Sequence, residues 1–129
     1  MSFAGDIVTE VYRLAARTDH KKLRPLIADD ATWDPAPKAK WNRCDNADEI
    51  VRTLLWRTSR ANRMRPGEMI ELGSSVAFRV RGKRLERLGA HGLLVPKLFQ
   101  VVEVRDGKIV RMHDHGKLED AIAATGHNS

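Results

Sequence analysis

Apolar residues recur at helical spacing in the first half of the chain. In GDIVTEVYRLAARTD, residues 5–19, Ile7, Val11 and Leu14 fall on one stripe, which predicts an amphipathic helix. A short second helix is expected in HKKLRPLIADD, residues 20–30, because its proline keeps such a helix short or kinked.

A strand and a capped helix are predicted next. ATWDP, residues 31–35, indicates a brief strand that ends at its proline. Asn46 followed by Glu49 resembles a capping box, so we expect a third helix to begin there. We expect this helix to fade near the proline and glycine at 66–67.

The spacing of apolar residues then changes to two, which is typical of half-buried strands. Val76, Phe78 and Val80 alternate with Arg79 and Arg81. These residues therefore predict one buried and one basic face.

Two turn signals join the predicted strands. Gly73-Ser74 is a plausible hairpin turn, and Asp106-Gly107 is the strongest hairpin signal in the chain. The last strand is expected over residues 108–114, before a terminal helix over 118–126. Helices gathered before strands favour an α+β fold in a single domain, 1–129, with a curved, mostly antiparallel sheet packed around the N-terminal helices. A conical pocket is expected between the third helix and the concave face.

Composition agrees with a globular chain and limits its location. Of 129 residues, 42% are hydrophobic and 31% are charged, which is ordinary for a folded domain. Cys44 is the single cysteine, so no intramolecular disulfide can form. The N-terminus lacks a basic signal-peptide region, and no apolar run approaches the roughly 20 residues that cross a bilayer. We therefore expect a cytoplasmic protein without a membrane partner.

The net charge of +6 permits an anionic partner. Two groups of basic residues contribute most to it: Arg57, Arg60, Arg63 and Arg65, then Arg79, Arg81, Lys83, Arg84 and Arg87. A solvated basic surface explains them better than a polyanion site, because single-strand readers also need stacking aromatics. Phe78 alternates with the arginines and so faces away from them. A nucleic-acid partner is therefore not expected.

The stretch RMHDHGK, residues 111–117, holds the first candidate for chemistry. Alternation places Asp114 with Met112 and Val110, and places the other strand residues on the second face: Ile109, Arg111, His113 and His115. An aspartate at the end of an apolar wall suits general-base chemistry. The alternative is that Asp114 caps the terminal helix.

His113 and His115 share a face and could chelate a metal. A metal site needs further ligands, and no other histidine has supporting spacing. We therefore predict no metal, and two exposed or dimer-facing histidines instead.

Two stretches of the sequence, in their order and separation along the chain, are typical of a known protein family: ADDATWDP, residues 28–35, and VRDGKIVRMHD, residues 104–114. The chain resembles the SnoaL-like domain of the nuclear transport factor 2-like superfamily, whose relatives include ketosteroid isomerases, polyketide cyclases and limonene-epoxide hydrolases. The resemblance implies a cone-shaped α+β barrel with a central cavity. It also implies a homodimer and no cofactor.

The resemblance further implies roles for four residues. An acid at the place of Asp114 is catalytic in such relatives, and Asp34 matches the proton-shuttling acid of the isomerases, although the stretch here is one residue shorter. Tyr12, also one residue out of step, and Gln100 match their two oxyanion donors. The alternatives are turn chemistry for Asp34 before Pro35 and a core position for Tyr12.

The residues expected around the pocket are Trp33, Trp56, Phe78, Val102, Met112 and His113. Ordinary packing is the alternative for the tryptophans. The leading hypothesis is a small, cofactor-free protein with a ligand pocket. If it is catalytic, we expect an isomerase, cyclase or hydratase/dehydratase that uses acid–base chemistry on an apolar carbonyl-bearing or polycyclic small molecule. The alternative is a non-catalytic small-molecule-binding or dimerisation domain, and a weaker one is a basic domain that docks on nucleic acid.

Overall fold

The computed structural model describes residues 4–36, 42–82 and 98–123. Five strands form one sheet in the order β1-β5-β4-β3-β2. Their bounds are β1 Ile27–Asp34, β2 Arg65–Leu72, β3 Ser75–Arg81, β4 Phe99–Arg105 and β5 Lys108–His115. β1 pairs with β5 in parallel, and the other neighbours are antiparallel. The predicted α+β fold with a mostly antiparallel sheet is confirmed, and within the described residues the sheet is open, with β1 and β2 at its edges.

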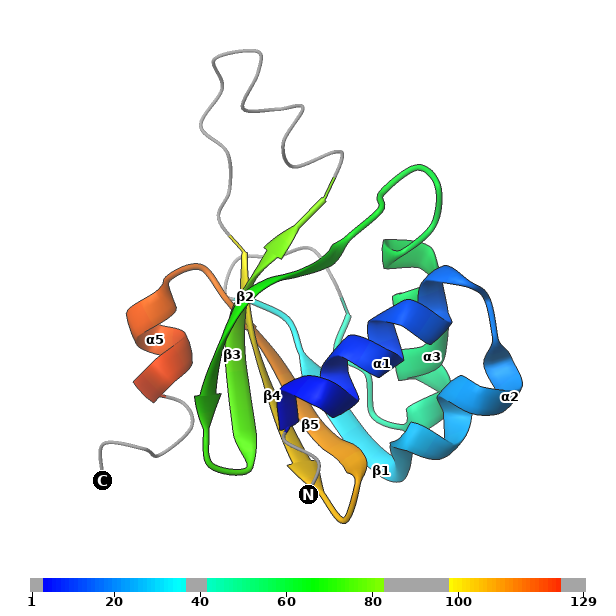
Figure 1. Cartoon of the computed structure of the whole chain (residues 1–129), viewed down its shortest axis with the longest axis horizontal. Coiled ribbons are helices and arrows are strands. Elements are labelled where there is room, and N and C mark those ends of the chain that lie inside the picture. The colour runs from blue at the N-terminus through cyan, green and yellow to red at the C-terminus, as the bar shows by residue number, and fades with distance from the viewer. Residues whose placement is uncertain (1–3, 37–41, 83–97, 124–129) are drawn as a thin grey trace.

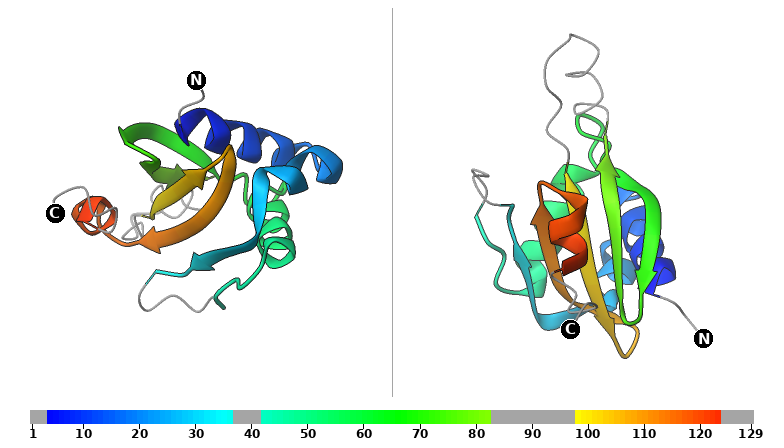
Figure 2. Two further views of the ribbon diagram at one scale, coloured as in Figure 1. Left: turned by 90° about the horizontal axis from the view of Figure 1, so that it is seen from below. Right: turned by 90° about the vertical axis from the view of Figure 1, so that its left-hand side faces the viewer.

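The helices divide between the two faces of this curved sheet. They are α1 Ala4–Ala16, α2 His20–Leu23, the 3₁₀ turn η1 Arg24–Leu26, α3 Ala47–Arg57 and α5 Leu118–Ala123. Figures 1 and 2 show α1 and α3 on one face, hereafter the inner face, and α5 on the opposite, outer face. The inner face is therefore the one that could carry a pocket.

β1 is longer than the sequence predicted, and the second helix is shorter. Pro25 stands at the start of η1, and the chain becomes extended at Ile27. Ile27 is buried, whereas Asp29 and Asp30 are exposed. Burial of Ile27 against the core outweighs the local helical preference of residues 26–30.

α3 begins as predicted and ends earlier than predicted. The Asn46 side chain accepts from the backbone N–H of Glu49 at 2.9 Å, which satisfies one of the first free N–H groups. The helix stops at Arg57 rather than near residue 66. There the carbonyl of Trp56 accepts from the backbone N–H of Ser59 at 3.2 Å and from the side-chain amide of Asn62 at 2.9 Å, so the end of the helix is hydrogen-bonded as the chain turns back.

Both predicted hairpins are present. Gly73 lies between β2 and β3 with a φ of 70°. Asp106 and Gly107 join β4 to β5 with φ values of 53° and 75°. Positive φ at both central residues is the requirement of a type I′ turn, which explains the strength of the Asp-Gly signal.

A bulge in β5 changes which side chains face the core. Glu103 pairs with Arg111 and Val104 pairs with Ile109, so Val110 is an extra residue opposite β4. Ile109 is consequently fully buried on the inner face, together with Met112. The prediction that Ile109 lies on the outer face was wrong, because strict alternation does not hold across a bulge.

Candidate functional site

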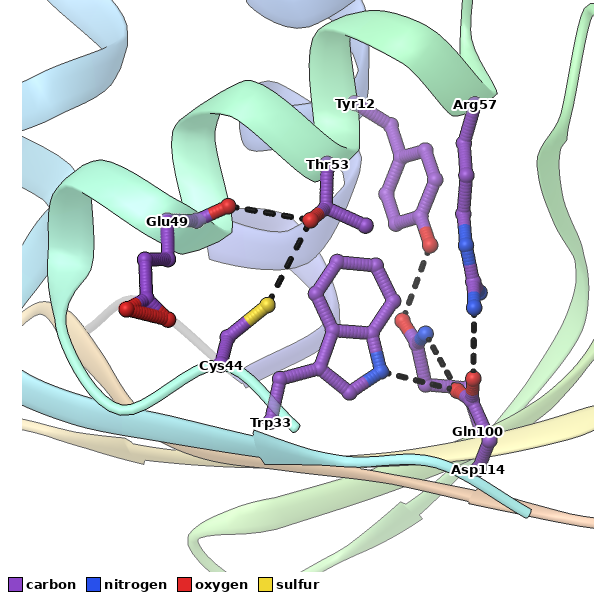
Figure 3. A network of polar contacts seen from close by, with 8 residues as sticks. All are labelled: Tyr12, Trp33, Cys44, Glu49, Thr53, Arg57, Gln100 and Asp114. Atoms are coloured by element: carbon purple, nitrogen blue, oxygen red, sulfur yellow. Dashed lines mark hydrogen bonds and ion pairs between the residues drawn. The ribbon is translucent and has the colours of Figure 1, made fainter. Parts of the chain in front are cut away.

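Asp114 lies at the centre of a buried polar network on the inner face. Its carboxylate accepts three hydrogen bonds: Oδ1 from the Trp33 indole Nε1–H at 3.0 Å and from Gln100 Nε2 at 2.9 Å, and Oδ2 from Arg57 Nη2 at 2.7 Å. Figure 3 shows these side chains converging from β1, β4, α3 and β5. Asp114 is only 2% exposed, so the alternative in which it caps the exposed start of α5 is wrong.

Gln100 joins this carboxylate to Tyr12. The Tyr12 hydroxyl donates to Gln100 Oε1 at 2.9 Å, while the same amide donates from Nε2 to Asp114. Burial raises the pKa of the Tyr12 hydroxyl well above its ordinary value, with a smaller contribution from the negative charge of Asp114. Tyr12 is therefore a hydrogen-bond donor and not an ionised base. Its ring meets Phe78 edge-on at 6.1 Å.

Arg57 supplies the positive charge of the site. Its guanidinium lies 4.3 Å from the centre of the Trp33 ring and pairs with Asp114, and both charged side chains are 2% exposed. Sequence reasoning counted Arg57 among surface arginines and so missed it. The available signal was its spacing, since Ile50, Leu54 and Arg57 continue one inward stripe of α3 at i, i+4 and i+7.

Burying an ion pair in a protein core carries a large desolvation free energy. Removing each of the two ions from water costs several kcal/mol. The attraction between the two charges and their additional hydrogen bonds must offset this cost. An apolar pair of equal volume would stabilise the fold as well or better. The buried pair of Arg57 and Asp114 is therefore a candidate for a functional role.

A narrow crevice leads to the Asp114 and Arg57 side chains. It measures about 10 Å³ and is also lined by Trp33, Cys44 and Thr53. The Cys44 thiol lies 3.3 Å from the Thr53 hydroxyl, which itself donates to the carbonyl of Glu49 at 3.0 Å. Because that hydroxyl proton is used, the thiol is the donor in the first contact. Burial also raises the pKa of the Cys44 thiol, which disfavours a nucleophilic thiolate.

The apolar residues predicted for the pocket lie on the inner face, packed together. Phe78, Val102 and Met112 are at most 1% exposed. Phe78, Gln100 and Asp114 are direct cross-strand neighbours, so they form one row beneath α1 and α3.

Three predicted residues lie elsewhere. Asp34 is on the opposite side of β1 from Trp33 and pairs with Arg43 at 3.3 Å, so it does not reach the network. Trp56 is 51% exposed on α3, because the next residue, Arg57, is the one that faces inward. These positions correct the expectation that Asp34 and Trp56 stand at the pocket.

His113, which was also expected at the pocket, lies on the outer face. Its ring contacts that of His115 with centroids 4.0 Å apart. Alternation along β5 explains this, since Asp114 between them points inward. Among the described residues, no group of three His, Cys, Asp or Glu side chains is placed to hold a metal ion.

The helices have one further property that bears on location. Within residues 4–36, 42–82 and 98–123, every helix is too short or too polar to cross a membrane. The cytoplasmic location stays a prediction.

Comparison with known proteins gives structural matches only. No family model and no curated protein matches the chain. A nuclear transport factor 2-like protein of unknown function from Mesorhizobium loti aligns with a TM-score of 0.65 and 18% identity, covering 87% of this chain and 88% of that one.

Two further matches carry functional descriptions. IdmH, a proposed polyketide cyclase from Streptomyces antibioticus, aligns with a TM-score of 0.63 and 19% identity over 95% of this chain and 98% of its own. A proposed ketosteroid isomerase from Kribbella flavida aligns with a TM-score of 0.57 and 16% identity over 85% and 77%. At such identities the similarity concerns the fold.

Proposed function

Because the chain has the nuclear transport factor 2-like fold, we propose that it is a cofactor-free enzyme that moves a proton on a small, apolar, carbonyl-bearing molecule. The observation that carries this proposal is the convergence of Tyr12, Trp33, Arg57 and Gln100 on the buried Asp114 carboxylate. IdmH and the proposed ketosteroid isomerase are described with activities of this general kind.

Asp114 is the proton acceptor in this proposal. Oδ2 accepts one hydrogen bond, from Arg57, and Asp114 is one of the residues that line the crevice. A carboxylate oxygen has two lone pairs, so one on Oδ2 is available to a C–H proton next to a carbonyl. When that proton moves to Oδ2, the negative charge moves to the enolate oxygen.

Arg57 makes this transfer electrostatically reasonable. Its guanidinium is a fixed cation in a water-poor site, where it attracts whichever neighbour carries the negative charge. It balances the carboxylate before the transfer and the enolate after it, so neither state leaves a buried charge without a counter-ion. Tyr12 and Gln100 supply further hydrogen-bond donors for the enolate oxygen once a ligand replaces their mutual contact.

The size of the crevice favours a second candidate, a non-catalytic binding or dimerisation domain. A volume of about 10 Å³ holds roughly one water molecule, and the carboxylate already accepts three hydrogen bonds from the chain. Turnover therefore requires side chains around the crevice to move, whereas a structural role requires no movement. The homodimer and the small-molecule ligand stay predictions in either case.

Hydrogen–deuterium exchange at carbon separates the two candidates without knowledge of the natural substrate. The probe is 2-tetralone in D₂O, followed by proton NMR. The wild-type protein should accelerate exchange next to the carbonyl, and Asp114→Asn should reduce that acceleration by about 100-fold or more.

Asp34→Asn is the matched control, because it makes the same chemical change at a carboxylate outside the network. It should leave exchange unchanged. Equal exchange in wild type and Asp114→Asn, or equal losses in the two variants, would reject the enzyme in favour of the second candidate.

A further inference from the structure

A separate groove runs along the outside of α1, beside the first residues of β2. It measures about 340 Å³ and is formed by one side of α1, at Thr9, Tyr12, Arg13 and Ala16, and by residues 64–67 and Met69. Figure 1 shows α1 alongside the sheet edge that β2 forms. The volume falls within the roughly 300–1,000 Å³ typical of small-molecule sites.

The walls of this groove are mostly apolar. Ala16, Met64, Pro66 and Met69 line it, together with Tyr12. Methionine side chains are flexible and polarisable, so they adapt to apolar ligands of different shapes. The groove therefore suits a hydrocarbon or aromatic body better than a sugar or nucleotide.

The charged residues of the groove are all cationic. Arg13 and Arg65 line it, and no carboxylate is among its lining residues within the described part of the chain. Arg13 holds Glu10 through Nε, at 2.9 Å, and Nη2. The guanidinium carries further N–H groups on Nη1, and the Arg13 side chain is 47% exposed. A carboxylate can therefore approach Arg13 while Glu10 stays bound.

From these observations we propose that the groove binds a small apolar acid, with its carboxylate at Arg13 and Arg65 and its apolar body along Met64 and Met69. The groove shares only Tyr12 with the buried network and shares no lining residue with the crevice beside Asp114. The proposal therefore stands whether or not Asp114 is catalytic.

The experiment compares octanoate with octanol, which have equal chain lengths and differ in charge. Each is titrated into ¹⁵N-labelled protein and followed by the amide shifts. Octanoate should shift amides of residues 9–16 and 64–69, and its Kd should be about threefold or more below that of octanol, as one partly exposed ion pair allows. Ala16→Trp, which places an indole in the groove, should weaken both ligands.

Arg13→Gln and Lys108→Gln form the matched pair, because each removes one positive charge from the protein. Lys108 lies in the hairpin at the other end of the sheet. Arg13→Gln should raise the octanoate Kd toward that of octanol, with Arg65 retaining part of the difference, and Lys108→Gln should leave it unchanged. Equal Kd values for the two ligands, equal effects of the two substitutions, or shifts confined to other residues would each overturn the proposal. Arg13 and Lys108 are both exposed, so this comparison remains decisive if Ala16→Trp does not fold.

Discussion

Adjacent residues of β5 meet two different kinds of polar environment. Asp114 points inward and is bonded by side chains from three other elements. His113 and His115 point outward and contact each other, and His115 Nε2 is buried without a hydrogen-bond partner in the part of the chain that the structure describes. Burial lowers the pKa of His115, and the nearby His113 lowers it further.

The difference concerns how burial is compensated. The inner carboxylate is surrounded by hydrogen-bond donors and a cation that come from residues distant in the sequence. Among the described residues, His115 Nε2 has no hydrogen-bond partner, so burial favours the neutral form of this side chain. The inner site should therefore respond strongly to loss of a partner, and the outer pair should respond to pH.

The largest effect is expected from breaking the ion pair. Arg57→Leu or Asp114→Asn alone should lower the free energy of unfolding by about 3–5 kcal/mol, because each leaves a buried group without its partner. Asp34→Asn, in a half-exposed pair with Arg43, should cost about 1 kcal/mol or less. Denaturant unfolding followed by tryptophan fluorescence measures both.

The double variant Arg57→Leu/Asp114→Asn sharpens this prediction. It should be less destabilised than the sum of the two single changes, since neither buried charge then remains. Additive losses would show that the two charges do not interact in the folded protein.

A medium effect is expected at the amide that links Tyr12 to Asp114. Gln100→Leu should cost about 2–4 kcal/mol, because the Tyr12 hydroxyl is left without its partner and the Asp114 carboxylate loses one of its three donors. Tyr12→Phe leaves only the buried Gln100 Oε1 without its donor, so it should cost less, about 1–2 kcal/mol. If Tyr12→Phe were the more costly of the two in the same unfolding assay, Gln100 would not bridge the network.

The smallest effect is expected on the outer face and depends on pH. Because the folded state lowers the His115 pKa below 6.5, the unfolded chain takes up a proton first as the pH falls. The contribution of neutral His115 should be complete above about pH 6.5 and should decline as the pH falls toward the folded pKa. His113 and Arg111 strengthen this decline, and Asp114 and Asp120 oppose it.

Melting temperatures measured between about pH 5 and pH 8 test this dependence. His115→Gln should flatten the curve, whereas His20→Gln, at an exposed position, should preserve its slope. A slope that survives His115→Gln would assign the pH dependence to other groups.

Local signals predicted most of the fold. The stripes of α1 and α3, the Asn46 cap and the Asp-Gly hairpin depend on residues close in sequence, and all are present. The parallel pairing of β1 with β5 joins segments far apart in the chain, so spacing rules carried no information about it.

The candidate site was predictable only in part. Alternation with Met112 placed Asp114 on the inner face correctly. Arg57 was missed because charged residues are rarely fully buried unless paired, and its partner lies 57 residues away. Asp34 was assigned by a motif that is one residue shorter here, and on a strand one residue changes the face.

Within β5, Val110 is the residue that has no partner on β4. As the unpaired residue of the bulge, it lets Ile109 and Met112 both sit on the core side although three positions separate them. A strand without Val110 would place Ile109 and Met112 two positions apart, so ordinary alternation would keep Met112 and Asp114 on the core side and His113 on the outer side. The buried carboxylate thus keeps its side of the sheet through its own pairing with Gln100, and the extra residue before it could be lost without reversing it.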